Sequence, residues 1–178
     1  MSVVIAPAPT GVTATDTLNL QLLIDAASVA GGEIQLRAGI YRVSGLVLPR
    51  AQVHPSLRGS GRGITKIEVL GAGTAITVSG EADGVEGVPS INDFDSATLS
   101  DLTLRSSGGS GVGVEFRATI GVRVERVTFE SLDTGARYLN RTAGSFTEPT
   151  TLPDVWFSWT TATPVAHAAE AGDPAIPR

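Results

Sequence analysis

The spacing of hydrophobic and polar positions changes once along the chain, at a pair of glycines. Before it, apolar residues between positions 18 and 27 recur at intervals of three and four, as on one face of an α-helix. Thr15-Asp16 offers a helix N-cap, and Gly31-Gly32 follows the last apolar position, where glycine commonly ends a helix. The pattern therefore predicts one helix, over residues 16–30.

After Gly32, short runs of β-favouring residues alternate with Gly, Ser, Asn and Asp. Neighbouring runs are not joined by a tight Asn-Gly or Asp-Gly turn, which argues against an antiparallel meander. Residues 1–15 contain Pro7 and Pro9 ahead of the helix and are predicted to be an extended lead-in. The predicted strands are 33–36, 41–43, 46–48, 65–70, 75–78, 97–104, 112–116, 122–129 and 136–139.

An internal repeat lies in the second half of the chain, where residues 98–106 resemble residues 123–131 at an offset of 25. A period of this length with two or three short strands suits one coil of a parallel β-helix, whose stacked coils share a continuous apolar column. The apolar positions that coincide are Leu99 with Val124, Leu102 with Val127, and Leu104 with Phe129.

Residues 16–67 resemble the opening of right-handed parallel β-helix proteins of the pectate-lyase-like superfamily. The resemblance implies that the helix caps one end of the coil stack. The resulting prediction is an all-β fold, a short single-stranded right-handed parallel β-helix over residues 16–144, followed by an extended C-terminal tail over 145–178. The stretches that carry it are Leu23-Ile24-Asp25-Ala26-Ala27, Gly31-Gly32-Glu33-Ile34-Gln35-Leu36, Ala38-Gly39-Ile40-Tyr41 and Leu57-Arg58-Gly59-Ser60-Gly61.

Composition narrows the function classes. The 178 residues suit one domain, and the absence of cysteine excludes disulfides, a thiol nucleophile and cysteine-based metal sites. With 13 basic and 18 acidic residues the net charge is -5, and no basic cluster occurs, so nucleic acid and anionic membranes are not expected as partners. The first eight residues contain no basic residue, so no secretory signal is predicted.

Catalytic motifs of the resembled enzymes are missing from the sequence. Glycoside hydrolysis needs two carboxylates facing one sugar, yet tandem acidic motifs are absent, and neither His54 nor His167 sits in a glycine-flanked turn. No catalytic residue, metal site or cofactor is therefore predicted. A loose acidic group is interpreted either as a substrate or calcium loop or as a solvated insertion, and it comprises Asp83, Glu86, Asp93 and Asp95.

Alternating charges follow the predicted strands of the repeat. Stacked coils place such residues side by side, so they form either a glycan-binding groove, a salt-bridged outer face or a face that pairs with another subunit. The candidates are Asp101, Arg105, Glu115, Arg117, Arg123 and Glu125, with Arg126 and Glu130 beside them.

The tail carries both tryptophans, Trp156 and Trp159, together with Phe157, in a segment rich in proline. These large apolar groups either cover the last coil or anchor the tail on a neighbouring subunit.

Together with the resemblance, these features predict a non-enzymatic phage virion protein: a capsid decoration or minor capsid protein, or a small tail-associated spike. It is expected to be a homotrimer made in the host cytoplasm and attached to the capsid or tail through its terminal segments. The alternatives are a polysaccharide lyase or glycoside hydrolase of the same fold, and a non-catalytic carbohydrate-binding adhesin module.

Overall fold

The computed structural model describes residues 2–49, 55–79, 81–82, 85–89, 97–117, 119, 122–140, 156–158 and 163–169. Within them lie one helix and fifteen strands. The elements are β1 (Val3–Ile5), α1 (Thr13–Ala30), β2 (Glu33–Gln35), β3 (Gly39–Val43), β4 (Leu46–Leu48), β5 (Ser56–Arg58), β6 (Thr65–Val69), β7 (Thr74–Ser79), β8 (Glu81–Ala82), β9 (Val85–Pro89), β10 (Thr98–Ser106), β11 (Val112–Arg117), β12 (Arg123–Glu130), β13 (Thr134–Asn140), β14 (Trp156–Ser158) and β15 (Thr163–Ala169).

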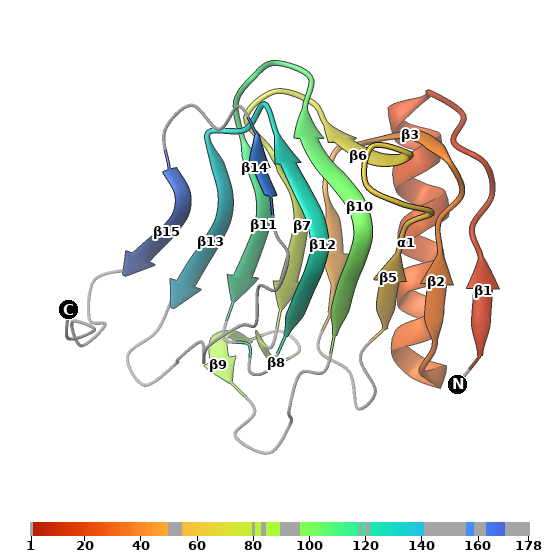
Figure 1. The fold of residues 1–178 in the computed structure, drawn as a ribbon. Coiled ribbons are helices and arrows are strands. Elements are labelled where there is room, and N and C mark those ends of the chain that lie inside the picture. The colour runs from red at the N-terminus through yellow and green to blue at the C-terminus, as the bar shows by residue number, and fades with distance from the viewer. Residues whose placement is uncertain are drawn as a thin grey trace.

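The strands form two larger parallel sheets between which the chain alternates (Figure 1). One sheet has the order β1-β2-β5-β10-β12-β14, with β6 pairing both β10 and β3, and the other has the order β15-β13-β11-β7-β4. A small antiparallel pair, β8 with β9, stands apart. The predicted all-β class with parallel sheets and one helix is thus confirmed at this level.

The repeat predicted from the sequence is present in the pairing of β10 with β12. All three predicted apolar pairs lie directly opposite each other in the register, and Thr103 pairs with Thr128. A parallel pair whose apolar residues lie opposite each other buries the same side of both strands. The offset of 25 residues therefore corresponds to one passage from a strand to its neighbour in this sheet.

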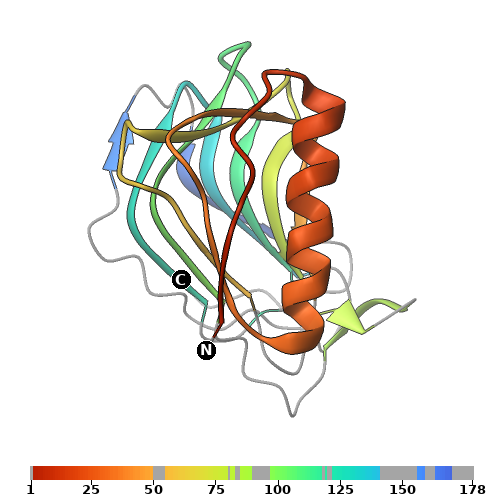
Figure 2. The ribbon, with the colours of Figure 1, turned by 90° about the vertical axis from the view of Figure 1, so that its right-hand side faces the viewer.

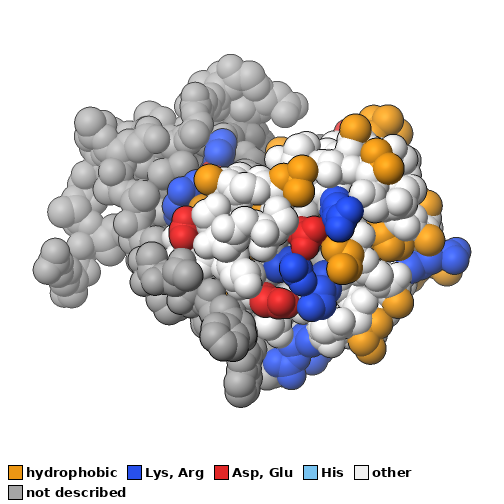
Figure 3. All heavy atoms as spheres, turned by 90° about the horizontal axis from the view of Figure 1, so that it is seen from above, with side chains coloured by type: hydrophobic (Ala, Val, Ile, Leu, Met, Phe, Trp, Pro, Cys, Tyr) orange, Lys and Arg blue, Asp and Glu red, His pale blue; other side chains and the backbone are white. Residues whose placement is uncertain are grey.

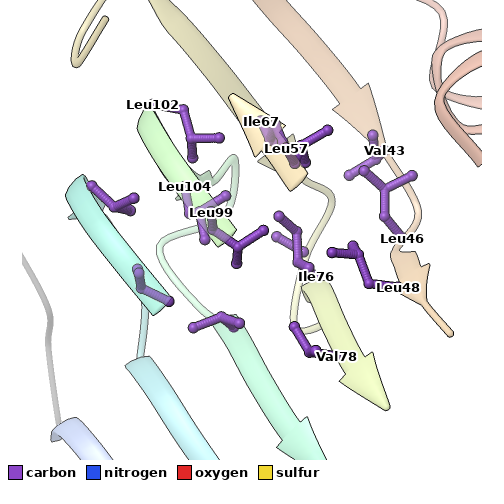
Figure 4. Close-up of a cluster of buried hydrophobic side chains, with 14 of the residues drawn as sticks. Val43, Leu46, Leu48, Leu57, Ile67, Ile76, Val78, Leu99, Leu102 and Leu104 are labelled. Atoms are coloured by element: carbon purple, nitrogen blue, oxygen red, sulfur yellow. The ribbon is translucent and has the colours of Figure 1, made fainter. Parts of the chain in front are cut away.

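Rows of apolar side chains run across the sheets and meet between them to form the core (Figure 4). Each row consists of residues that are paired in register from strand to strand, and almost all of them are fully buried. Two rows of the first sheet are Ile34-Leu57-Leu99-Val124 and Tyr41-Ile67-Leu104-Phe129. Two rows of the second sheet are Leu46-Ile76-Val114-Ala136 and Leu48-Val78-Phe116-Tyr138.

Strands β10 and β12 bend at equivalent positions. Asp101 has φ +57° and Arg126 has φ +53°, in the left-handed region that non-glycine residues seldom occupy. The first half of β10 pairs with β5 and its second half with β6, so the bend marks a corner between two flat stretches. Gly59 stacks on this corner, and a Cβ there would lie 2.2 Å from the Asp101 carbonyl oxygen. A side chain at Gly59 would therefore force this segment away from β10.

Helix α1 starts three residues earlier than predicted. Its N-cap is Val12, which makes no side-chain capping bond, so the predicted Thr15-Asp16 cap is wrong. The buried Asp16 carboxylate instead accepts hydrogen bonds from Thr10 N (2.8 Å), Thr10 Oγ1 (2.7 Å), Gly11 N (3.3 Å) and Arg42 N of β3 (3.1 Å). The Asp16 carboxylate therefore ties the start of α1 to the preceding segment and to β3.

The end of α1 agrees with the prediction. Gly31 has φ +70° and its N–H donates to the Ala27 oxygen at 2.8 Å. The helix contacts β2, β3 and β4 and buries Leu20, Ile24 and Ala27 against them. Figures 1 and 2 show α1 running lengthwise beside the strands, at the end of the sheets where β1, β2 and β3 lie. Its inner face thus covers the apolar end of the core.

Several short strands were not predicted. β1 lies in the expected lead-in 1–15, β5, β8 and β9 lie in expected loops, and β14 and β15 lie in the expected tail 145–178. Trp156 pairs with Thr128 and Phe157 with Phe129, so β14 continues the register of β12. Proline is tolerated in β15 because β15 lies at the edge of its sheet in the described order.

Candidate functional site

A row of alternating charges crosses four neighbouring strands of the first sheet. Arg42 of β3 pairs with Glu68 of β6, Glu68 with Arg105 of β10, and Arg105 with Glu130 of β12. We call these four residues the charge row. The two inner members, Glu68 and Arg105, each lie opposite a residue of opposite charge on both neighbouring strands, which is the favourable arrangement for cross-strand pairs.

The distances within the charge row confirm the pairing. Arg42 Nε donates to Glu68 Oε1 at 3.1 Å, and Arg105 Nε lies 2.9 Å from Glu68 Oε2 as an ion pair without hydrogen-bond alignment. Arg105 Nη1 lies 3.6 Å from Glu130 Oε1, and Lys66 Nζ donates to Glu130 Oε2 at 3.1 Å. Glu68 is nearly buried, so its two arginines compensate a charge that has lost most of its water.

A second group of charges, the corner cluster, surrounds the bend at Asp101. Arg126 binds the Asp101 carboxylate with both Nε and Nη2, at 2.6 and 2.9 Å, and Arg58 Nε lies 3.3 Å from it. The hydrogen bonds from Arg126 are the main reason that the pKa of Asp101 lies below its usual value. The same contact raises the pKa of Arg126.

The corner cluster extends from Asp101 in both directions. Arg126 Nη2 lies 3.0 Å from Glu125 Oε1, and Arg123 Nε lies 2.7 Å from Glu125 Oε2. On the other side, Arg58 Nη1 lies 3.9 Å from Glu33 Oε1. The cluster thus contains three carboxylates and three guanidinium groups, and its net charge is zero.

Glu115 lies on the second sheet and is the most completely buried carboxylate of the described strands, at 0% exposure. Arg137, opposite it on β13, donates from Nε to Oε2 at 2.6 Å and also contacts it through Nη2. Arg117, two residues along β11, binds the other carboxylate oxygen. Both arginines are partly exposed, so Glu115 fixes two cations at the surface.

The structure divides the predicted site residues among these three groups rather than bringing them onto one face. Arg105 belongs to the charge row. Asp101, Arg123 and Glu125 belong to the corner cluster, and Glu115 and Arg117 lie on the other sheet. Ion pairs occur in all three groups. Partners that the sequence did not indicate are Glu33, Arg42, Arg58, Glu68 and Arg137.

The remaining candidates fall largely outside the described residues. Asp83, Asp93, Asp95, His54 and Trp159 are not described, whereas Glu86 lies on β9, His167 on β15, and Trp156 and Phe157 on β14. Among the described residues, no group of three or more His, Asp or Glu side chains is placed to hold a metal ion.

Seen from above, acidic and basic side chains lie interleaved in the middle of the described surface, and hydrophobic side chains lie toward the end formed by α1 (Figure 3). No helix in the described part of the chain has the length and apolar character needed to span a bilayer. Comparison with protein-family models, with curated proteins and with solved structures finds no match.

Proposed function

We propose that the protein is a non-enzymatic structural module built on a short, single-stranded, right-handed parallel β-helix. The alternation of the chain between two parallel sheets supports this fold. Each return to the first sheet is a crossover between parallel strands, and such connections are right-handed in about 98% of cases. The position of α1 against β2, β3 and β4, at one end of the sheets, also fits the capping role that the family resemblance implies.

The observation that carries the non-enzymatic part is the pairing of the carboxylates on the strands. Glu68, Asp101 and Glu115 are each bound by two arginines. Glu125 is also held by two arginines, and Glu130 by Arg105 and Lys66. A glycosidase needs one carboxylic acid and one carboxylate that are open to the sugar. Most of these ion pairs instead join one strand to another, as Glu68, Asp101 and Glu130 do, which suits a rigid structural part.

The resemblance to pectate-lyase-like β-helices supports a place in a phage virion, as a capsid decoration or minor capsid protein or as a small tail-associated spike. The partners would be two further copies in a homotrimer, and a capsid or tail. In Figure 1, β1 lies at one end of the row of strands and β15 lies at the opposite end. This separation supports attachment through the terminal segments.

Light scattering on the purified full chain tests the proposal. We expect a mass of three times 18.3 kDa, or a whole multiple of that trimer, at micromolar protein concentration. Replacing Trp156 and Trp159 together by alanine should lower the mass while leaving the far-ultraviolet circular dichroism unchanged, because the tail anchors the assembly. Simultaneous loss of mass and β-structure would instead assign these side chains to covering the last coil.

A matched assay addresses the enzymatic alternative. The full chain is incubated with acidic polysaccharides, and the formation of unsaturated uronates and of new reducing ends is followed. A monomer that releases either product would overturn the proposal in favour of a lyase or hydrolase. Binding to a polysaccharide without cleavage, again by a monomer, would favour the adhesin module.

A further inference from the structure

The outer face of α1 is largely apolar and exposed. Leu18, Leu22 and Val29 expose 59%, 58% and 90% of their surface, and Thr15 and Ala26 are exposed as well. The spacing of 3, 4, 4 and 3 residues places all five along one stripe of the helix, with Thr15 at its N-terminal end as the one member that carries a hydroxyl group. We call these residues the outer stripe.

The inner face of the same helix is already used. Leu20, Ile24 and Ala27 are buried against the strands, so α1 is apolar on two opposite sides. A surface helix of a globular protein normally has its apolar residues on one side and polar residues on the other. Figure 2 shows the outer side of α1 facing away from the strands, with the N-terminal strand beside it. The outer stripe therefore resembles the contact face of an interface more than a solvated surface.

Strand β1 continues this apolar surface at the same end. Val3 and Ile5 are exposed, and among the described residues β1 pairs with β2 alone. Proteins usually protect such an edge with lysine, proline or a bulge, and residues 3–5 contain no lysine or proline. The edge lacks two common safeguards against association.

The low charge of this end of the molecule indicates which kind of partner would bind the outer stripe. Residues 1–36 contain no lysine or arginine, and their acidic residues are Asp16, Asp25 and Glu33. Asp16 is buried and Glu33 lies near Arg58, so Asp25 is the one acidic group on the outer side of α1 in the described structure. A strongly basic or acidic partner would find almost no complementary charge there. A second copy of the same stripe matches it chemically.

We propose that two copies of the chain pair through their α1 helices, antiparallel to each other, about a two-fold axis near Leu22. This arrangement sets Leu22 against Leu22, Leu18 against Ala26, and Thr15 against Val29 of the second copy. Leucine then faces alanine on both sides of the axis, which suits close helix packing, and the Thr15 methyl group lies against Val29. Asp25 faces Asn19 of the second copy.

The same charge excludes a parallel arrangement about a three-fold axis. Three parallel helices that buried the outer stripe would bring three Asp25 carboxylates together, and like charges at such a contact are destabilising. An α1 of 18 residues is about 27 Å long, so the outer stripe offers a second helix a line of contact over most of that length. The pairing goes beyond the proposed trimer, and it predicts an even number of copies.

Cysteine scanning tests the geometry, and the absence of native cysteine makes every thiol diagnostic. Single variants Leu22→Cys, Thr15→Cys and Val29→Cys of the full chain are treated with a short bismaleimide. Leu22→Cys should cross-link to itself, and Thr15→Cys should cross-link when mixed with Val29→Cys but much less by itself. Ser107→Cys, exposed on a distant turn, is the control and should not cross-link.

Other cross-linking patterns would overturn the proposal. Strong self-linking of both Thr15→Cys and Val29→Cys would indicate parallel helices. Cross-linking of Ser107→Cys to the same extent as Leu22→Cys would indicate random collision.

Light scattering gives an independent readout. Leu22→Arg should halve the mass of the assembly, because it puts a charge at the centre of the interface on both copies. Ile64→Arg makes the same kind of change at an exposed apolar residue of the turn between β5 and β6, and it should leave the mass unchanged.

The two proposals can fail separately. The mass of the Leu22→Arg variant tests the trimer, because it should correspond to three copies if the trimer exists and to one copy if it does not. The ratio of the wild-type mass to the variant mass tests the α1 pairing. An unchanged mass in Leu22→Arg, with no link between Thr15→Cys and Val29→Cys, would assign the outer stripe to a different protein and overturn the pairing.

Discussion

The outward faces of the strands and the outward face of α1 follow opposite rules. On the strands, charged residues of neighbouring coils lie opposite each other and neutralise each other, as in the charge row. On α1 the outward residues are largely apolar and carry almost no charge. Each charged residue of the charge row finds a partner on the next strand, whereas the outward side of α1 faces away from the strands (Figure 2). The charges on the strand faces are thus paired within the chain, whereas the outer stripe is the face for which we propose a second copy as partner.

This comparison separates stability from association. Changes in the charge row, the corner cluster or Glu115 should alter the free energy of unfolding without altering the mass of the assembly. Changes on the outer stripe should do the reverse. The inner side of α1 belongs with the strands, and its buried carboxylate provides the strongest test.

Asp16→Ala should produce the largest loss. It would remove the acceptor of three backbone N–H groups, those of Thr10, Gly11 and Arg42, in a buried site. Because hydrogen bonds to charged groups contribute about 1.5–3 kcal/mol each and unsatisfied buried donors are costly, we expect unfolding to become easier by about 3 kcal/mol or more. Urea denaturation measures the difference.

Asp25→Ala is the matched control on the outer side of the same helix, where the carboxylate accepts one hydrogen bond, from Gln21 at 2.8 Å. Its cost should stay below about 1 kcal/mol. Equal losses for the two variants would contradict the role of Asp16 in tying α1 to the strands.

Glu115→Gln should have the second largest effect. The substitution keeps the size of the side chain but removes the charge that binds Arg117 and Arg137. Losing one partner of a fully buried ion pair costs about 3–5 kcal/mol, and here the partial exposure of both arginines reduces the expected loss to about 2 kcal/mol. Thermal and urea unfolding measure it, with light scattering to confirm that the mass is unchanged. A variant that stays stable but no longer assembles would show that Glu115 and its arginines contribute to a subunit interface rather than to stability.

The sequence predicts the pairing of strands where the offset between paired residues is constant. The repeat at an offset of 25 predicted the register of β10 and β12, because the apolar residues of both strands recur in the same order. The end of α1 at Gly31 was also predicted. Strands such as β5 and β14 are three residues long, which is too short for their own composition to predict a strand. Their extended conformation depends on pairing with neighbouring strands.

Half of the charge row, Arg42 and Glu68, could not be placed from the sequence for a related reason. Arg42 and Glu68 are 26 residues apart and the spacing from Glu68 to Arg105 is longer, whereas Arg105 and Glu130 share the 25-residue offset of the repeat. No single period aligns the four residues, so their register appears only in the folded chain. Asp101 and Arg126 do share the 25-residue offset, and that signal was available.

Asp101→Asn should cost about 1 kcal/mol at neutral pH, because the carboxylate is bound by Arg126 and Arg58 near the surface. The pKa of Asp101 in the folded protein lies below its usual value, so the ionised form stabilises the fold. This contribution is complete above the unfolded pKa of about 3.9 and is lost as the pH falls through the lower folded pKa. The difference between wild type and variant in urea denaturation should therefore shrink toward about pH 3. A difference that is independent of pH would show that the charge is not the stabilising feature.

Arg123→Ala should have the smallest effect, at the outer end of the corner cluster. Its side chain is 57% exposed, and its contact is Glu125 at 2.7 Å, whose other oxygen is already held by Arg126. An exposed pair of this kind contributes about 0.2–1 kcal/mol, so we expect a loss below about 0.5 kcal/mol in urea denaturation and no change in mass. Because this residue is one of the predicted glycan or subunit contacts, the same variant tests that role. If the mass of the assembly fell while the free energy of unfolding stayed the same, the corner cluster would contribute to association as the outer stripe is expected to do. Association would then not be confined to α1.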